Sequence, residues 1–336
     1  MAIITNTAEY LNHATTETGD IAGGREDLSN AIYDISPTET PFVSNIARTK
    51  ATGVRHEWQT DSLAAAAVNA VDQGHDYLGT TTTNAIGSVT ATSRISNVTQ
   101  ISSKTLIIAG TTEAILKAGR KSELAYQVAK KGKELKRDVE YNLTGVATGE
   151  LVAVSGTGAK TRSLENWMST NAGHATTGTT GATVTTPTTA VTDGTQRPLT
   201  EDLVRAQIQA IWSAGGDPDC MLVGPVNKQN ISSQFAGIAT LYRDANSGPA
   251  TIVGASDIYI HDFGELKVIP SRFSRDRTVS ILQKDMWAVA YLRPFRIDKM
   301  AKTGDAEKRL MLVEYCLEAR NEAASGKVAD LTTTLI

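Results

Sequence analysis

The chain has 336 residues, of which 40% are hydrophobic and 21% are charged. These proportions are ordinary for a folded protein, and the length predicts two lobes or one elongated domain with extensions. The formal net charge of −3 argues against a dedicated nucleic-acid binder, but not against a protein that encloses nucleic acid. The sequence shows no secretory signal and no apolar run near the roughly 18 residues of a membrane span. We therefore expect a soluble protein, made in the cytoplasm, with no membrane partner.

Residues 1–53 are predicted to form an arm. The segment starts with a polar, Thr-rich stretch and continues as GREDLSNAIYDISPTETPFVSNI from Gly24 to Ile46. Pro37 and Pro41 prevent a regular continuation of any helix that precedes them. Such an arm could lie across a neighbouring subunit or cap the protein's own core. A short amphipathic helix before the prolines is indicated by the spacing of Asp27, Leu28, Ala31, Ile32 and Ile35.

Residues 54–104 are predicted to form an extended β-hairpin. Apolar and polar positions alternate from Val54 to Thr60 and again, less strictly, from Ile86 to Ile101. The sequence between them is small and polar, with Gly74 and Gly79 as breakers. A two-stranded hairpin has little core of its own, so we expect it to be stable only when it lies on a partner.

The clearest helix is predicted over about residues 120–144, within a segment that runs from 105 to 197. Ser122 can cap its N-terminus and Gly145 ends it, which gives a length of roughly 37 Å at 1.5 Å per residue. One face is apolar and comprises Leu124, Val128, Leu135, Val139 and Leu143. The other face carries the cations Lys130, Lys131, Lys133, Lys136 and Arg137. That face is either solvated, with ion pairs along the helix, or in contact with DNA or an acidic neighbour.

The rest of this segment, residues 146–197, is rich in Thr, Gly and Ala and cannot bury much apolar area. We expect a long surface loop or a Thr-rich hairpin, held to the core by Leu164, Trp167 and Met168.

Residues 198–290 are predicted to form an α/β unit. A helix that Thr200 can cap ends at Gly215 and Gly216, and the apolar strand Cys220–Val223 leads into a second helix. Four short strand candidates follow, and residues 291–336 look like paired strands around the turn Thr303–Asp305. The first helix is expected to bury Leu203, Ala206, Ile208, Ala210, Ile211 and Trp212. Trp58, on the hairpin, could equally be a core residue or an interface anchor.

Two stretches, AGGDPDCMLVGP (Ala214–Pro225) and the arm stretch Gly24–Ile46, resemble segments of the major head proteins of tailed bacteriophages, which have the HK97-type capsid fold. The resemblance covers nearly the whole chain and implies an α+β fold with a fixed order of parts. These are an N-terminal arm (1–53), an extended loop (54–104), a peripheral domain with a spine helix and a Thr/Gly-rich insertion (105–197), an axial domain (198–290) and return strands of the peripheral domain (291–336).

The resemblance further implies self-assembly, as pentamers and hexamers, into an icosahedral head that encloses viral double-stranded DNA through weak, non-specific contacts. A scaffolding protein, a portal and a possible decoration protein would be partners, and the product would lie in the virion capsid after assembly in the host bacterial cytoplasm. The founding member joins its subunits through a lysine on the extended loop. No lysine occurs between Val54 and Ser103, so that covalent bond is not expected. The alternatives are an encapsulin-like shell or other self-assembling structural protein, and a soluble α/β enzyme with an unrecognised site.

No catalytic, cofactor-binding or metal-binding residues are predicted, so the chain is expected to be no enzyme and to need no cofactor. The stretch Ser155–Thr161 lacks the glycine that a phosphate-binding loop places before its Lys-Thr pair. Cys220 and Cys316 each lie in an apolar run and are expected to be buried, reduced thiols. None of the histidines has the spacing of a metal pair: His13, His56, His75, His174 and His261.

Overall fold

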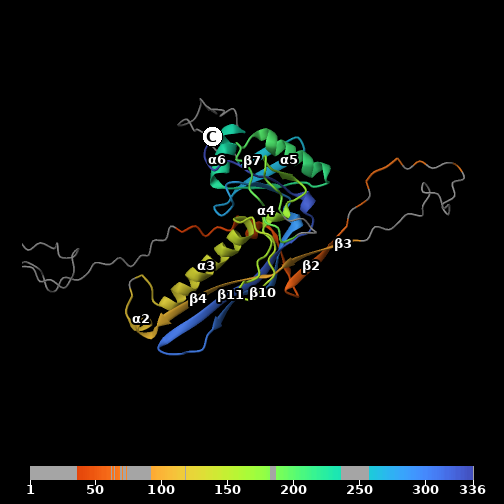
Figure 1. The fold of residues 1–336 in the computed structure, drawn as a ribbon. Coiled ribbons are helices and arrows are strands. Elements are labelled where there is room, and N and C mark those ends of the chain that lie inside the picture. Colours follow the sequence, from red (N-terminus) through yellow and green to blue (C-terminus); the bar gives the residue numbers. More distant parts are fainter. Residues whose placement is uncertain are drawn as a thin grey trace, which may run out of the picture.

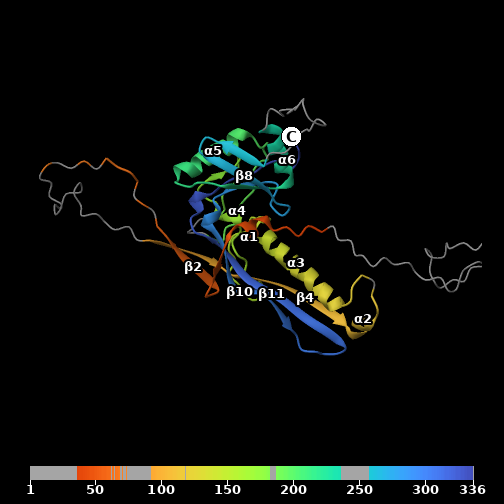
Figure 2. The same cartoon turned by 180° about the vertical axis from the view of Figure 1, so that it is seen from behind.

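The computed structural model describes residues 36–61, 63, 65–68, 70, 73, 92–117, 119–181, 187–235 and 257–335. The predicted arm helix before Ser36 and the glycines at the hairpin tip lie outside these residues. Figures 1 and 2 show an upper lobe, an elongated lower lobe, and a pair of strands that projects sideways from their junction.

The lower lobe is built on a four-stranded sheet with the order β1-β10-β11-β4, here called the long sheet. Strands β10 and β11 are antiparallel and connected around Gly304, which confirms the predicted strand pair. Strand β4 joins β11 antiparallel, and β1 adds to the free edge of β10 in the parallel direction. The bounds are β1 (Ala47–Lys50), β4 (Gln100–Ala109), β10 (Trp287–Lys299) and β11 (Ala306–Ala319).

The predicted long helix is α3 (Glu123–Thr144), and it packs on one face of the long sheet. The Ser122 side chain accepts a hydrogen bond from the amide of Ala125, and Gly145 is the C-cap residue, so both predicted ends are confirmed. Only the second half of the apolar face is deeply buried. Leu124 and Val128 are half-buried, whereas Leu135, Val139 and Leu143 lie in the lower core.

The lower core lies between α3 and the long sheet and extends to Cys220, Leu222 and Leu282 of the upper lobe. Its sheet side consists of alternate residues of β11, including Val313, Tyr315 and Leu317, because every second side chain of a strand points to the same face. Phe42, from the short helix α1 (Pro41–Asn45), enters this core from the arm. Pro41 occupies the first position of α1, where its missing N–H leaves no hydrogen bond unmade.

The upper lobe contains a six-stranded sheet with the order β5-β12-β9-β6-β8-β7, here called the mixed sheet. Its central strand β6 pairs parallel with β8 and antiparallel with β9. Helices α5 (Glu201–Ser213) and α6 (Pro225–Gln234) cover it. The strands are β5 (Ala172–Gly173), β6 (Cys220–Val223), β7 (Ile258–His261), β8 (Gly264–Pro270), β9 (Val279–Leu282) and β12 (Gly326–Val328). The last of these, from the predicted return segment, therefore lies in the upper lobe.

Helix α5 differs from its prediction in which side chains it buries. Val204, Ile208 and Ile211 enter the upper core, whereas Ala206 and Trp212 are exposed. Positions 204, 208 and 211 lie on one side of a helix with 3.6 residues per turn. Trp212 is rotated by 100° about the helix axis from Ile211, so it points away from that side. Thr200 is the N-cap residue, but its side chain makes no capping hydrogen bond. Gly215 adopts a φ of 90° at the end of the helix, a conformation that favours glycine.

The projecting pair consists of β2 (Arg55–Thr60) and β3 (Ser93–Val98), which are antiparallel with Arg55 opposite Val98. The two strands confirm the predicted hairpin. The second predicted strand is, however, divided, because β3 ends at Val98 and β4 starts at Gln100 in the long sheet. The chain therefore passes directly from the hairpin into the lower lobe.

Three shorter elements lie between the lobes in the chain: α4 (Leu164–Trp167) and the 3₁₀ helices η2 (Lys284–Met286) and η3 (Glu322–Ala324). The short helix α2 (Gly110–Ala114) joins β4 to α3 at the far end of the lower lobe. The predicted buried residues Leu164, Trp167 and Met168 lie in the lower core. The described part of the Thr- and Gly-rich stretch is mostly irregular, with isolated bridges such as Thr179 to Thr192.

Candidate assembly surfaces

The β2–β3 hairpin extends away from the body of the molecule (Figures 1 and 2). Beyond β2, the side chains of Leu63 and Val68 are 98% and 99% exposed. A two-stranded ribbon with exposed apolar residues gains little stability from itself. It is therefore a surface that a neighbouring molecule can stabilise by covering it.

The base of the hairpin is firmly attached to the body. The indole N–H of Trp58 donates a hydrogen bond to the carbonyl oxygen of Ala319 at 2.8 Å, and its ring packs on Trp167 with 5.6 Å between centroids. Arg55 forms an ion pair with the buried carboxylate of Glu150 at 2.9 Å. Trp58 is thus a partly buried anchor of the hairpin within its own subunit.

A polar cluster centred on Glu318 supports this attachment. The carboxylate accepts a hydrogen bond from Thr49 at 2.7 Å, lies 3.1 Å from the imidazole of His56 and pairs with Arg320 at 3.2 Å. Burial raises the pKa of Glu318, but the bonds from Thr49, His56 and Arg320 outweigh it and hold the pKa below its usual value. The cluster joins β1, β2 and β11 at one place.

A buried polar network lies where the hairpin, the long sheet and the upper lobe meet. Arg162 is buried, donates to the side-chain oxygen of Asn166 at 2.7 Å and lies 4.0 Å above the ring of Trp167. Burial lowers the pKa of Arg162 to about 10. Asn97 of β3 donates to the carbonyl oxygen of Leu317 at 2.7 Å and accepts from the amide of Arg162 at 3.1 Å.

A second buried cation, Lys327, connects the mixed sheet to α4. Its ammonium donates to the carbonyl oxygen of Glu165 at 2.9 Å, and burial lowers its pKa to about 8. Arg275 bridges the carboxylates of Glu165 and Asp193 at 2.9 and 2.7 Å. These three cations, Arg162, Lys327 and Arg275, are not predictable from sequence patterns, because a cation in a loop or strand gives no periodic signal. For Arg162 alone, a hint was its closeness in sequence to Leu164 and Trp167, which were expected to be buried.

The surface of the upper lobe carries an exposed aromatic pair. Trp212 of α5 stacks on Phe263 with 5.1 Å between centroids, and the two side chains are 49% and 38% exposed. Ile258 and Ile260 of β7 are also exposed nearby in sequence. A shallow groove of about 650 Å³ runs between α5 and β7 and is lined by both acidic and apolar side chains.

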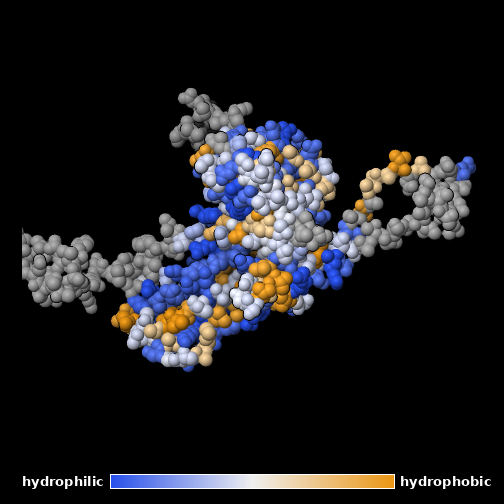
Figure 3. Space-filling view, in the orientation of Figure 1, coloured by the Kyte–Doolittle hydropathy of each residue, from blue (hydrophilic) through white to orange (hydrophobic). Residues whose placement is uncertain are grey.

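Further apolar patches lie on the lower lobe (Figure 3). A single exposed apolar side chain is ordinary, but groups of them mark surfaces that are covered in an assembly. The large exposed apolar side chains of this lobe include Ile101, Ile107, Ile115, Leu116, Phe295, Ile297 and Met300.

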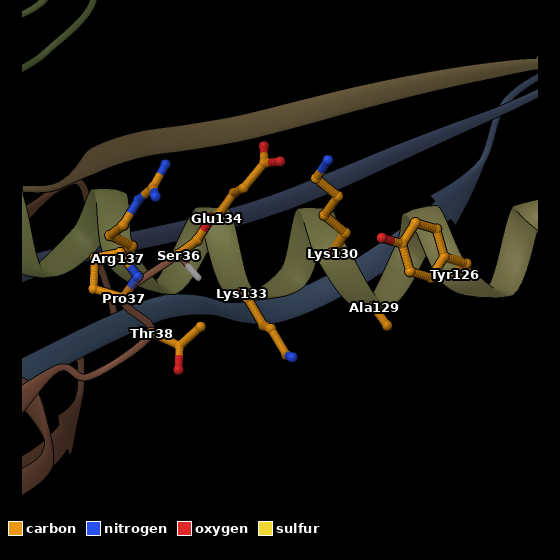
Figure 4. Close-up of a pocket in the computed structure, with 9 residues that line it drawn as sticks. All are labelled: Ser36, Pro37, Thr38, Tyr126, Ala129, Lys130, Lys133, Glu134 and Arg137. Carbon is orange, nitrogen blue, oxygen red and sulfur yellow. The ribbon is translucent and has the colours of Figure 1, made fainter. Parts of the chain in front are cut away.

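The cationic face of α3 is partly neutralised within the subunit. Lys131 pairs with Glu134 at 2.7 Å, whereas Lys130 and Lys133 are exposed and lie beside a groove of about 350 Å³ next to the arm (Figure 4). The ion pair agrees with the interpretation of a solvated face. The exposed lysines leave the alternative of an acidic contact open.

The described residues contain no group of three or more His, Cys, Asp or Glu side chains that could hold a metal ion. Burial raises the pKa of the thiols of Cys220 and Cys316 to about 12, and both are free and buried as predicted.

The stretch Ser155–Thr161 is part of an extended turn with a bridge from Leu151 to Lys160, and not a strand-to-helix loop. His13 and His75 lie outside the described residues. Within the described residues, no helix has the length and apolar character needed to cross a bilayer.

A two-lobed subunit with a projecting hairpin and several apolar surfaces belongs to the class of structural, assembly-forming proteins. Comparison with known families agrees: the chain belongs to the SU10 major capsid protein family, whose match extends over residues 4–332. The major capsid protein of Escherichia phage Phieco32 is 26% identical over 345 aligned positions, which cover 91% of this chain and 94% of that protein.

Solved phage capsid structures share the fold. The Cyanophage A-1(L) capsid asymmetric unit matches with a TM-score of 0.61 and 15% identity, covering 92% of this chain and 97% of that one. A structure of phage G gp27 major capsid proteins with gp26 decoration proteins matches with a TM-score of 0.53 and 14% identity, covering 91% and 95%. The chain is thus a tailed-phage major capsid protein with an α+β fold of the HK97-like kind. It forms the phage head, is located in the virion capsid and is not an enzyme.

Proposed function

We propose that this subunit assembles as pentamers and hexamers into an icosahedral head that encloses double-stranded DNA. The observation that carries the proposal is the β2–β3 hairpin, which projects from the body with Leu63 and Val68 almost fully exposed. In a closed shell the hairpin would lie over the neighbouring subunit, so each copy would cover the exposed apolar surface of the next. Many such interfaces give a large total burial from modest pairwise contacts.

We propose that the parts of this subunit correspond to the domains that the resemblance implies. The long sheet with α3 would serve as the peripheral domain, the mixed sheet with α5 and α6 as the axial domain, and β2–β3 as the extended loop. The strong attachment of the hairpin base through Trp58 and Arg55 supports the assignment of β2–β3 as the extended loop, because force between subunits would reach the two lobes through these contacts.

A separate scaffolding protein, a portal and a decoration protein are proposed partners. The structure of phage G capsid proteins together with decoration proteins supports the last of these. The net charge of −3 supports only weak, non-specific contact with the packaged DNA, since strong phosphate binding requires many cations. The SU10 family match does not favour an encapsulin-like compartment.

The test is to express the full chain alone and together with a candidate scaffolding protein, and to image the products by electron microscopy with light scattering for mass. Closed shells, or isolated pentamers and hexamers, are expected. A variant in which residues 61–92 are replaced by a short Gly-Ser linker should fold but should not form shells. A stable monomer or dimer of the unaltered chain under every condition would overturn the proposal.

A further inference from the structure

One carboxylate holds both ends of the Thr- and Gly-rich stretch. Oδ2 of Asp330 accepts a hydrogen bond from the amide of Ala175 at 2.9 Å, and Oδ1 accepts one from the amide of Gly194 at 2.5 Å. The imidazole Nδ1 of His174 lies 3.1 Å from Oδ2. Between these attachments the structure describes residues 176–181 and 187–193. Residues 174–196 thus form a loop, here called the clasped loop, whose two ends meet at Asp330.

The backbone on either side of Asp330 is tied to the upper lobe. Asp330 follows strand β12 closely, and its carbonyl oxygen accepts a hydrogen bond from the amide of Arg197 at 2.8 Å. The next amide, of Leu331, donates to the carbonyl oxygen of Arg277 at 3.0 Å. Asp330 has a φ of 62°, a left-handed conformation that Asp and Asn adopt more readily than most residues. Its side chain is fully buried, so the carboxylate is a fixed point for the loop.

Polar contacts and close backbone packing hold the clasped loop, and an apolar core does not. None of its described residues is fully buried. A Cβ at Gly178 would overlap Oδ2 of Asp330, and a Cβ at Gly194 would overlap the amide nitrogen of Gly178. These two glycines therefore allow the two ends of the loop to approach one carboxylate.

His174 is the titratable partner of this carboxylate. A neutral imidazole with its proton on Nδ1 donates to Asp330, and Nε2 is buried with no hydrogen-bond partner among the described residues. A second proton, on Nε2, would be a buried donor without an acceptor. Burial and the charge of Lys327 lower the pKa of His174, although Asp330 and Glu165 oppose this shift.

The charged side chains around the contact come from α4, from β12 and from the loops beside them. They are Asp330, Asp193, Glu165, Lys327, Arg197, Arg275 and Arg277. The cations already outnumber the carboxylates, so a protonated His174 would add to an excess of positive charge. Hydrogen bonds from the amides of Gly194 and Ala175 and from His174 outweigh burial and hold the pKa of Asp330 below its usual value. His174 is therefore the member of the pair that takes up a proton first as the pH falls.

We propose that Asp330 and His174 form an acid-sensitive clasp that closes residues 174–196 onto the upper lobe at neutral pH. Asp330 supplies the fixed acceptor, and neutral His174 completes the contact. When His174 takes up a proton, the loop ends leave Asp330. The inference concerns a single subunit and does not depend on the proposed assembly.

The direction of the pH effect follows from where His174 binds protons more readily. In the open loop the imidazole is in water, where its pKa is near 6.5. The open state thus binds more protons than the closed state around and below this pH. The closed state is fully favoured above pH 6.5 and loses stability relative to the open state as the pH falls.

The experiment measures amide hydrogen exchange of the unassembled full chain by mass spectrometry at pH 7.5 and 5.5. A synthetic peptide of residues 171–197 gives the unprotected exchange rate at each pH. Protection of the amides of Ala175 and Gly194 should fall severalfold at pH 5.5, up to about tenfold for one proton taken up over one pH unit. His174→Asn keeps a donor near the position of Nδ1 but takes up no proton, so its protection should be the same at both pH values.

Two further variants test the carboxylate itself. Asp330→Asn suits the same φ but replaces one acceptor oxygen with an NH₂ group that faces an N–H donor. Protection of the loop ends should fall about tenfold or more at both pH values. Gly178→Ala should open the loop while both side chains of the clasp remain. Asp262→Asn, which changes an exposed carboxylate of the same lobe, is the matched control and should leave the loop protected.

Amides of β6 and β9 in the same samples show whether the mixed sheet stays folded. The proposal is wrong if the loop ends stay protected in Asp330→Asn while these strands are unchanged. It is also wrong if the loss of protection at pH 5.5 is as large in His174→Asn as in the unaltered chain. Should Asp330→Asn expose the whole sheet, Gly178→Ala decides, and unchanged exchange of the loop in that variant would overturn the clasp.

Discussion

Glu140 accepts a hydrogen bond from the backbone amide of Phe42 at 2.8 Å, and it accepts a second from the amide of Val43 at 2.9 Å. The two amides belong to the first turn of α1, where backbone N–H groups have no partner within the helix. Glu140 is buried in α3, and the side chain of Phe42 is buried in the lower core. One carboxylate therefore attaches the arm to the helix on which the lower lobe is built.

Glu140→Ala should destabilise the subunit by about 1–3 kcal/mol, because two buried amides lose their acceptor. Glu140→Gln keeps one acceptor oxygen and should cost less. The free energy of unfolding, measured by chemical denaturation, gives the comparison. Trypsin cleavage after Arg48 should become faster in Glu140→Ala, since the arm is held less firmly. Equal cleavage rates in all three proteins would show that Glu140 does not hold the arm.

The same residue, Glu140, should also make the stability of the subunit vary with pH. Burial raises the pKa of Glu140 from 4.5 to about 7, although the two amides oppose this shift. The folded state thus binds more protons than the unfolded state between these pH values, and stability should fall as the pH rises from about 4.5 to 7. The slope for one such group is at most about 1.4 kcal/mol per pH unit. Glu140→Gln should lose this contribution, as thermal melts of both proteins from pH 4.5 to 8 would show. A pH profile identical to that of the unaltered chain would contradict the assignment.

Leu135→Ala should destabilise the subunit by about 2–5 kcal/mol, because Leu135 is buried between α3 and the long sheet and its removal leaves a cavity. Leu124→Ala on the same helix is the matched control. Leu124 is half-buried, so the same change there should cost markedly less. Denaturation curves of the unassembled subunits measure both. Similar losses at the two positions would mean that the first half of α3 is packed as tightly as the second.

Trp212→Ser should reduce shell formation more than it reduces the stability of the subunit. The stacked pair of Trp212 and Phe263 is exposed, and its loss should cost the folded subunit only about 1 kcal/mol. A surface aromatic that is covered in an assembly contributes far more to association. The yield of shells by light scattering should fall, while Leu335→Ser, at another exposed apolar position, should have little effect. Normal shell yield with Trp212→Ser would exclude this pair from the interfaces.

Both thiols should be unreactive in the folded protein. Cys220 and Cys316 are buried, and burial raises the pKa of each thiol to about 12, so very little thiolate is present at neutral pH. A thiol reagent should label neither residue at pH 8 until denaturant unfolds the chain, and then it should label both. Labelling of Cys220 alone under native conditions would indicate local opening of the mixed sheet.

The sequence by itself determined the elements whose signals are local. The end residues of α3, the hairpin strands and the pair β10–β11 follow from caps, alternation and turn residues within a few positions of one another. Burial of both cysteines followed from the apolar runs that contain them. These features were predictable because the groups that decide them are neighbours in the chain.

Only the tertiary structure decided which surfaces meet. Apolar periodicity indicates that α5 has a buried side, but the position of the mixed sheet selects Val204, Ile208 and Ile211 and leaves Trp212 exposed. The bond of Glu140 to the arm joins residues 98 positions apart, and Lys327 reaches Glu165 across 162 positions. Such buried polar contacts have no sequence period. They exist because the folded chain brings a charged group and its partner together away from water, where each would be costly alone.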